Sequence, residues 1–356
     1  GMVYFEGEYH LFYQHYPDST IWGPMHWAHA VSSDLIHWEH LPIALYPDSL
    51  GYIFSGSAVV DWNNTTGFGK DGEPPLVAIF TYHDMTAQEA GGNNHETQGI
   101  AYSTDRGRNW IKYSGNPVIP NPGGVRDIRD PKVIWDDAND QWVMVLAVGD
   151  HMEFWNSSDL KAWEKLSEFG QNLGNHGGVW ECPDLFPMTV DGSTEKKWVL
   201  IANINPGNPN GGSGTQYFIG DFDGKNFLLD TRFSQDVQEG TGVWLDYGKD
   251  NYAGVTWSDV PDEAGRRIFI GWMSNWQYAK LVQTDKWRNA MTLPWSLSLK
   301  LTSEGYRIYS APVEETRLLR KATVELKDQE INGVLELNDL VEFSTTLSEL
   351  ELEFNF

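Results

Sequence analysis

Four short segments repeat one turn pattern, and this repeat limits the possible folds more than any other feature of the chain. Each segment follows a strand-like run and places an acidic or small turn-forming residue four or five positions before an aromatic residue. The segments are 33–38, 103–110, 158–163 and 220–227. Such residues close a hairpin turn by bonding the backbone, and the aromatic ring can then pack back onto the sheet.

The spacing of the repeat indicates the architecture. The acidic residues of the four copies are Asp34, Asp105, Asp159 and Asp223, so successive copies lie 71, 54 and 64 residues apart. A period of about 60 residues in an all-β chain is typical of the four-stranded blades of a propeller. A fifth unit, from residue 252 to about residue 299, would close the ring. We therefore predict an all-β, five-bladed β-propeller; a large sandwich or jelly roll with similar hairpins is the alternative.

Apolar or alternating runs bounded by Gly, Pro, Asn and Asp support the all-β prediction. The runs are 3–13, 27–31, 56–60, 76–82, 132–135, 142–148, 198–204 and 267–272. We expect no helical segment before residue 310, because no stretch there has a helical period.

The composition changes near residue 311, which predicts a domain boundary. We expect the propeller over 1–310, with its first strand shortened, and a linker over 311–324 that is either helical or extended. Residues 325–356 alternate as strands do and predict the start of a β-sandwich. That sandwich would be incomplete, because about three strands cannot bury an independent core.

Charge and composition exclude several classes of partner. The chain carries 50 acidic and 25 basic residues, for a formal charge of −25, whereas nucleic acids and anionic membranes are bound chiefly through Lys and Arg. No apolar run approaches the roughly 18 residues of a membrane span, so we expect a soluble protein. Cys182 is the only cysteine, which excludes an intrachain disulfide. We expect no cofactor and no metal, and we expect His15, His26 and His83 to be turn or core residues.

Two acidic motifs, within segments 129–131 and 180–184, suggest carboxylate chemistry on a sugar. Glycoside cleavage needs one carboxyl group to protonate the leaving oxygen and a second group to stabilise or trap the oxocarbenium-like centre. Proline follows Asp130 and precedes Asp184, and this stiffens both motifs. Taken singly, Glu181 could be an exposed loop acid and segment 129–130 a structural ion pair.

Several blocks together resemble glycoside hydrolase family 32, the β-fructosidases that include invertases, inulinases and levanases. The resemblance runs from residue 1 to at least residue 301, and it implies a five-bladed propeller followed by a β-sandwich. The blocks are Gly1-Met2-Val3-Tyr4, Gln14-His15-Tyr16-Pro17, Trp22-Gly23-Pro24-Met25-His26-Trp27, Phe54-Ser55-Gly56-Ser57, Arg129-Asp130-Pro131, Glu181-Cys182-Pro183-Asp184 and Ser274-Asn275-Trp276.

The resemblance implies roles for the two acids. Glu181 matches the general acid/base of the family, and Asp130 matches its transition-state stabiliser. An acid that works near neutral pH needs a raised pKa, and we expect packing beside Trp180 and Cys182 to provide the desolvation. Asp130 should instead stay ionised, with Arg129 as its neighbour, so that it can accept bonds from sugar hydroxyls.

The resemblance also implies a sugar-binding shell around the terminal fructose. Aromatic faces suit the apolar C–H patches of a furanose ring, while amide and hydroxyl groups bind its hydroxyls and fix its orientation. The shell residues are Gln14, Trp22, Phe54, Ser55, Arg129 and Trp276.

The chain departs from the family at its first residue. The nucleophile of the family is an aspartate in an Asn-Asp-Pro-Asn-Gly segment, and this sequence begins at the glycine. Because retaining hydrolysis proceeds through a covalent intermediate on that carboxylate, we expect the chain as given to have little or no turnover while still binding sugar.

The predicted function is that of a retaining glycoside hydrolase that releases terminal β-D-fructosyl units from fructans (levan or inulin) or from sucrose. The alternatives are a non-hydrolytic fructan-binding propeller and a five-bladed glycosidase that acts on arabinan or xylan. The expected partner is a carbohydrate. We expect an extracellular or periplasmic location, because fructan polymers are met outside the cytoplasm.

Overall fold

The computed structural model describes residues 1–261, 266–284, 286–330, 333–337 and 347–353. Residues 1–315 form one compact unit and residues 316–356 form a second. Among the described residues, no helix is long and apolar enough to cross a membrane.

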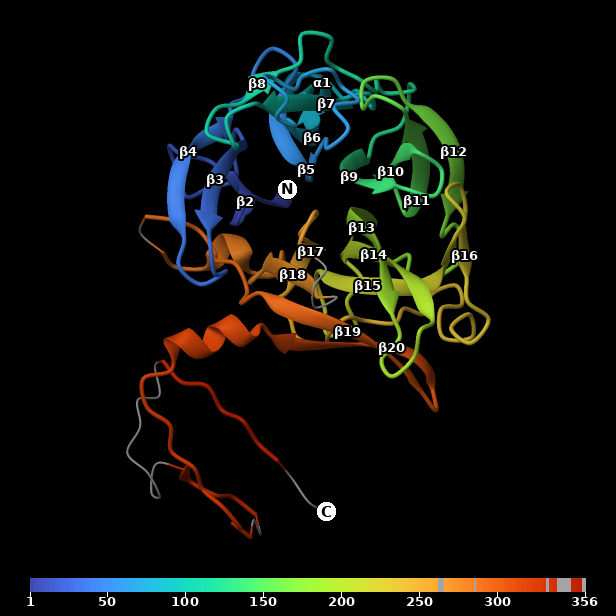
Figure 1. Ribbon diagram of the computed structural model, residues 1–356. Helices are drawn as coiled ribbons and strands as arrows, with labels where there is room; N and C mark the ends of the chain where they lie inside the picture. Colours follow the sequence, from blue (N-terminus) through green and yellow to red (C-terminus); the bar gives the residue numbers. More distant parts are fainter. Residues whose placement is uncertain (262–265, 285, 331–332, 338–346, 354–356) are drawn as a thin grey trace. The chain divides into compact units, whose positions relative to one another are not determined.

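Within its described residues, the first unit is a five-bladed β-propeller, as predicted, and each blade is a four-stranded antiparallel sheet (Figure 1). Blades 1 and 2 comprise β1 (Met2–Phe5), β2 (Glu8–His15), β3 (His26–Ser32) and β4 (Glu39–Leu45), then β5 (Tyr52–Val60), β6 (Leu76–His83), β7 (Glu96–Ser103) and β8 (Ile111–Lys112). Blade 3 comprises β9 (Ile128–Asp136), β10 (Gln141–Val148), β11 (His151–Ser157) and β12 (Glu164–Phe169). Blades 4 and 5 comprise β13 (Val179–Thr189), β14 (Lys196–Asn205), β15 (Gly214–Phe222) and β16 (Phe227–Leu229), then β17 (Tyr252–Thr256), β18 (Arg267–Trp272), β19 (Trp295–Thr302) and β20 (Gly305–Pro312).

Strands pair in chain order within every blade, and the innermost strands β1, β5, β9, β13 and β17 surround the propeller axis (Figure 1). The core lies between neighbouring blades, so a middle strand is covered on both faces. Strand β6 is accordingly buried along its whole length, which explains why its sequence is a continuous apolar run rather than an alternating one. The largest core cluster joins blades 3, 4 and 5 through residues such as Phe154, Trp180 and Phe269.

Blade 1 is tied to blade 5 by backbone hydrogen bonds that close the ring. The Tyr4 N–H donates to the Ser258 carbonyl oxygen at 2.9 Å, and the Ser258 N–H donates to the Met2 carbonyl oxygen at 3.2 Å. Strand β1 thus adds a short parallel bridge to the segment that follows β17.

The repeated turn pattern is confirmed, and it marks the connection between the third and fourth strands of blades 1 to 4. In blade 3, the Asp159 carboxylate accepts hydrogen bonds from the Lys161 and Ala162 N–H groups, both at 2.9 Å. The Trp163 indole N–H donates to the Leu160 carbonyl oxygen at 3.0 Å. The equivalent bonds recur around Asp34, Asp105 and Asp223.

Two expectations about secondary structure were wrong. The run 3–13 is two strands rather than one, because Glu6 and Gly7 form a turn with φ angles of 47° and 91°. A helix, α1 (Met85–Glu89), precedes residue 310, and the Asp84 side chain caps it by accepting from two backbone N–H groups. A five-residue helix is too short to produce a helical period. A 3₁₀ turn, η2, spans Ala279–Leu281.

Strand β20 ends at Pro312, and a 3₁₀ helix, η3, spans Glu314–Leu319. The described residues of the second unit contain no strand. Residues 331–332, 338–346 and 354–356, which belong to the predicted sandwich segment 325–356, lie outside the described residues. The domain limits at 310 and 324 and the start of a sandwich therefore stay predictions.

The turn bonds predict a measurable cost for Asp159→Ala. Removing the carboxylate that accepts from two backbone N–H groups should lower the free energy of unfolding by about 1–2 kcal/mol, and Asp159→Asn, which keeps an acceptor oxygen, should lose less. Urea unfolding would show this as a lower midpoint with an unchanged slope. Asp137→Ala, at an exposed position of the same blade, is the control. Equal midpoints for Asp159→Ala and the control would contradict the turn's contribution.

Candidate active site

The innermost strands of blades 2 to 5 share one irregularity near their first residues. In each, two consecutive residues face a single residue of the next strand, so the ladder shifts register. The bulged pairs are Phe54-Ser55, Asp130-Pro131, Cys182-Pro183 and Ala253-Gly254. Because a bulge bends its strand and redirects side chains, these pairs are the positions where the propeller aims groups at its axis.

The backbone at three of these bulges is in a region that few residues other than glycine adopt. Asp130, Cys182 and Ala253 have φ angles of 63°, 43° and 54°. Such conformations cost about 1–3 kcal/mol each and persist where the surrounding structure enforces them, which is common at functional sites. A proline can follow Asp130 within β9, the edge strand of its sheet that faces the axis, because a bulge needs no ladder donor there.

Buried polar side chains hold the start of β9. The Asp130 N–H donates to the Thr81 hydroxyl oxygen at 2.9 Å, and this hydroxyl donates to the Gln98 side-chain oxygen at 2.6 Å. The Gln98 amide then donates to the Ile128 carbonyl oxygen at 2.9 Å. Thr81 and Gln98 are fully buried in blade 2, so blade 2 fixes the backbone of Asp130 in blade 3.

A second buried amide holds the bulges of blades 4 and 5. The Asn203 side-chain amide donates to the Cys182 carbonyl oxygen at 2.8 Å and to the Gly254 carbonyl oxygen at 3.2 Å. The Thr215 hydroxyl donates to the Asn203 side-chain oxygen at 2.6 Å, which fixes the orientation of the amide. Asn203 therefore holds the bulges of blades 4 and 5 in a fixed relation.

The two predicted acids lie at one place in this hub. An Asp130 carboxylate oxygen accepts hydrogen bonds from the Cys182 N–H at 2.9 Å and from the Cys182 thiol at 3.4 Å. Burial raises the pKa of that thiol well above its ordinary value, so it keeps its proton and can donate. The Ser55 hydroxyl also bonds to the Cys182 thiol, which places Ser55 in the same group.

The charge on Asp130 is set mainly by burial. Desolvation raises the pKa of its carboxyl group to about 6, although the Arg129 charge lowers it and the Glu181 charge raises it further. We expected Arg129 to be the partner that keeps Asp130 ionised. The guanidinium group forms ion pairs instead with Glu96 at 2.7 Å, Asp127 at 2.9 Å and Glu181 at 3.4 Å.

Glu181 lies between two donors. One of its carboxylate oxygens is 3.4 Å from Arg129 Nε, and the other accepts a hydrogen bond from the Tyr252 hydroxyl. The Trp180 ring, which we expected to shield this carboxyl group, packs inside blade 4 against Phe218. Tyr252, which the sequence motifs did not identify as a site residue, holds Glu181 from blade 5. Glu181 is thus oriented by residues of the two flanking blades.

The predicted shell residues of blades 1 and 2 lie together. The rings of Trp22 and Phe54 are 6.3 Å apart in an edge-to-face arrangement, and Phe54 stacks on His83 at 4.1 Å with an interplanar angle of 10°. The Gln14 side-chain amide donates to the Ile53 carbonyl oxygen at 3.0 Å, beside the bulge that carries Phe54.

Trp276 joins the site from blade 5. Its ring centroid lies 5.0 Å from that of Trp272, and Trp272 is 6.4 Å from Tyr252, the partner of Glu181. Trp22 and Trp276 are the exposed aromatic members of the predicted set, with 41% and 37% of their surface accessible. Contacts through Trp272 and Tyr252 thus connect the exposed Trp276 to Glu181.

The amino group of Gly1 also lies in the hub. Burial lowers its pKa to about 4, and the nearby charges that act on it include those of Lys132, Cys182 and Asp130. A residue joined to the Gly1 nitrogen would therefore enter the hub close to Asp130.

Comparison with known proteins identifies the family. Residues 1–312 match the domain described as "Glycosyl hydrolases family 32 N-terminal domain". The chain belongs to glycoside hydrolase family 32. It is 54% identical over 333 residues to a levanase of Bacillus subtilis. The aligned region covers 93% of this chain and 47% of the levanase. It is 42% identical over 336 residues to the extracellular exo-inulinase of Aspergillus niger. That aligned region covers 88% of this chain and 62% of the exo-inulinase.

A solved structure of the family shares the fold. The crystal structure of the exo-inulinase from Aspergillus awamori superposes with a TM-score of 0.80 at 40% identity, covering 88% of this chain and 63% of the other. The chain therefore spans about half to two thirds of the length of these family 32 relatives.

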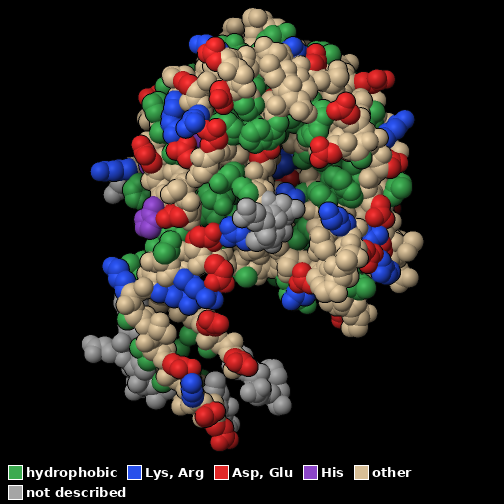
Figure 2. All heavy atoms as spheres, viewed as in Figure 1, with side chains coloured by type: hydrophobic (Ala, Val, Ile, Leu, Met, Phe, Trp, Pro, Cys, Tyr) green, Lys and Arg blue, Asp and Glu red, His purple; other side chains and the backbone are tan. Residues whose placement is uncertain are grey.

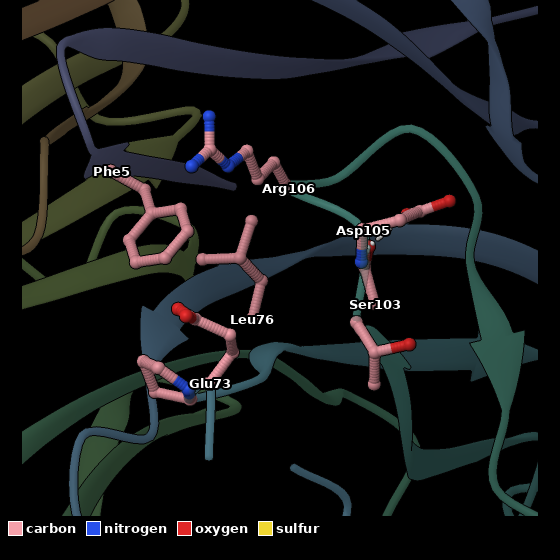
Figure 3. Close-up of a pocket in the computed structure, with 8 residues that line it drawn as sticks. Phe5, Glu73, Leu76, Ser103, Asp105 and Arg106 are labelled. Atoms are coloured by element: carbon pink, nitrogen blue, oxygen red, sulfur yellow. Dashed lines mark hydrogen bonds between the residues drawn. The ribbon is translucent and has the colours of Figure 1, made fainter. Parts of the chain in front are cut away.

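Two cavities lie away from the acid pair of this family 32 propeller. One, of about 290 Å³, is lined by Phe5, Leu76 and Arg106 among others (Figure 3). The other, of about 530 Å³, is lined by Lys132, Trp257 and Asp259 among others. Neither lining includes Asp130 or Glu181. Acidic side chains are spread over the face seen in Figure 2, in keeping with the formal charge of −25.

The raised pKa of Asp130 predicts a pH-dependent gain in stability for Asp130→Asn. The unfolded aspartate loses its proton near pH 4 and the folded one near pH 6, so wild-type stability falls as pH rises through this window. The asparagine variant lacks this loss, and its advantage in unfolding free energy should grow by about 2–3 kcal/mol between pH 4 and pH 7.

Thermal unfolding of both proteins at several pH values measures this difference. Asp34→Asn is the control, because bonds from His37 hold the pKa of Asp34 well below its ordinary value, so its difference from wild type should stay nearly constant from pH 4 to pH 7 and change only at lower pH. A difference between Asp130→Asn and wild type that stays constant from pH 4 to pH 7 would contradict the effect of burial on Asp130.

Proposed function

We propose that the protein is a retaining glycoside hydrolase that releases terminal β-D-fructosyl units from fructans such as levan and inulin, or from sucrose. The observation that carries the proposal is the convergence of Asp130 and Glu181 at one hub, where Cys182 and Arg129 connect them. Relatives named levanase and exo-inulinase support a fructan substrate. The arabinan or xylan alternative loses its support, because residues 1–312 match family 32.

In this mechanism Glu181 donates a proton to the leaving glycosidic oxygen and then takes a proton from the attacking water. Its contacts with Arg129 and Tyr252 are suited to keep the carboxyl group in one orientation through both steps. Asp130, buried and ionised above about pH 6, would accept bonds from fructosyl hydroxyls as positive charge develops on the ring.

The covalent step needs a nucleophile on the opposite side of the fructosyl unit from Glu181. The family resemblance implies an aspartate within an Asn-Asp-Pro-Asn segment joined to Gly1. The burial of the Gly1 nitrogen and the action of the Asp130 charge on it support this assignment, because a segment attached there would start near the hub. We propose that this aspartate forms the fructosyl-enzyme intermediate.

The proposed substrate contacts follow the shell predicted from the sequence. Trp22, Phe54 and Trp276 would pack against the sugar, while Gln14 and Ser55 would bond its hydroxyls. Arg129 has three carboxylate partners, which suits it better to orienting Glu181 than to binding sugar alone. Fructan polymers lie outside the cytoplasm, and one relative is named an extracellular exo-inulinase, so we propose an extracellular or periplasmic location.

Removing the proposed acid/base should nearly abolish turnover. In the full-length protein, Glu181→Ala should lower kcat for sucrose by about 10²–10⁴-fold, the usual contribution of general acid–base catalysis. Fructose release measures the rate, and Glu164→Ala, at an exposed position of the outer strand β12, is the control. A loss below about tenfold would remove Glu181 from this role. Sugar binding without any turnover by the wild-type protein would favour the fructan-binding alternative.

The stereochemistry of the first product tests the double displacement. Two successive inversions at the anomeric carbon predict that fructose is released as the β-anomer from a β-fructoside. Proton and carbon NMR spectra recorded in the first minutes, before mutarotation, should show this anomer. Initial release of the α-anomer would indicate a single displacement and would exclude the covalent intermediate.

A further inference from the structure

A fully buried carboxylate, Glu96, joins parts of the site that belong to different blades. It is the first residue of β7 in blade 2, and none of its surface is accessible. One carboxylate oxygen is 3.1 Å from His83 Nδ1 and 2.7 Å from an Arg129 NH group, and the other accepts from the Ile128 N–H at 2.8 Å. Glu96 therefore holds both the side chain of Arg129 and the backbone just before it.

One branch from Glu96 leads to Glu181. Arg129 lies between the two carboxylates, at 2.7 Å from Glu96 and 3.4 Å from Glu181, and only 13% of its side chain is exposed. The charge of Glu96 offsets the cost of burying this guanidinium group. Without it, Arg129 would lose its shortest ion pair and its fixed position beside Glu181.

The other branch leads to Phe54. The His83 ring stacks on Phe54 at 4.1 Å, and its second nitrogen lies 2.5 Å from the Gln88 side-chain oxygen on helix α1. Glu96 and Gln88 therefore hold the two edges of the imidazole and fix its plane. The Phe54 ring, which packs against that plane, is fixed in turn.

His83, His95 and Glu96 also form a group whose ligand atoms lie within 4.8 Å of one another, which is close enough to hold a metal ion. Their present partners argue against that use. The Glu96 oxygen that faces His83 already pairs with the Arg129 cation, and a metal ion at the same oxygen would face a like charge. His95 Nδ1 is bonded to the Gly92 carbonyl oxygen. The contacts are those of a hydrogen-bond network.

We propose that Glu96 is a positioning residue that orients the acid/base Glu181 through Arg129 and orients the sugar-stacking Phe54 through His83. The inference rests on the proposed function and deepens it, because it names the group that couples acid catalysis to substrate binding. The sequence carried no sign of it, since Glu96 lies in an ordinary strand far from both acidic motifs.

If a residue acts through the general acid, the loss of rate on mutating it should depend on how much protonation the leaving group needs. In sucrose cleavage the glucose unit departs through an alkoxide oxygen that needs the proton of Glu181, whereas fluoride leaves β-D-fructofuranosyl fluoride with its bonding electrons and needs little protonation. A defect in acid positioning therefore slows sucrose cleavage more than fluoride release. A general loss of folded protein lowers both rates by the same factor.

The experiment compares these two substrates in the full-length protein and its Glu96→Gln variant. Glutamine is uncharged and has only one acceptor oxygen. Its NH₂ group therefore faces an N–H donor, of either Ile128 or Arg129, and one of these two hydrogen bonds is lost. We expect kcat/KM for sucrose to fall by about 10²-fold and that for the fluoride by less than about tenfold. Glu153→Gln is the matched control, because Glu153 is also buried and paired, with Lys165, but lies in blade 3.

His83→Phe tests the second branch. A phenyl ring keeps the stacking partner of Phe54 but cannot bond Glu96, so KM for sucrose should rise by about tenfold with kcat within about threefold. Equal losses on both substrates for Glu96→Gln, or unchanged kinetics in both variants, would overturn the inference while leaving the proposed function intact. A wild-type protein that cleaves neither substrate would overturn both.

Discussion

The hub of this propeller depends on hydrogen bonds between buried side chains and the bulges of the innermost strands. A bulge takes residues out of the sheet ladder, and buried backbone groups that lose a ladder partner need another one. Thr81 supplies that partner for Asp130, and Asn203 supplies it for Cys182 and Gly254. Because each of these side chains belongs to a strand further from the axis, the regular part of the blades fixes the irregular part that carries the chemistry.

The electrostatics of the hub follow from its composition. Asp130, Glu181 and Glu96 act on one another, and Arg129 is the cation among them. Negative charge in excess over positive charge suits a reaction whose transition state gathers positive charge on the sugar ring. A second buried ion pair joins Lys132 and Asp184 at 3.1 Å, and the backbone of Thr256 accepts a hydrogen bond from Lys132 and donates one to Asp184. It connects blades 3, 4 and 5 near the axis.

The features that could be predicted from the sequence are those encoded by neighbouring residues. The turns at Asp34, Asp105, Asp159 and Asp223 are local, so their repeat revealed the blades. The acidic motifs were visible for the same reason. Tyr252 reaches Glu181 across 71 positions and Glu96 reaches Arg129 across 33, and such contacts leave no local pattern. His83 was expected to be a turn or core residue; it is buried, and its contacts with Phe54 and Glu96 connect it to the candidate site.

The ring symmetry supports the assignment of the nucleophile. Blades 2 to 5 each begin their innermost strand with a two-residue bulge directed at the axis, and two of these bulges carry or adjoin the proposed catalytic acids. In blade 1 the innermost strand β1 starts at Met2, and the charges of Cys182 and Asp130 act on the buried nitrogen of Gly1. An Asp-Pro pair joined shortly before Gly1 would resemble Asp130-Pro131 in both composition and place. The nucleophile would then use the same backbone device as the transition-state stabiliser, because a bulge lets a proline follow the acid without breaking the ladder.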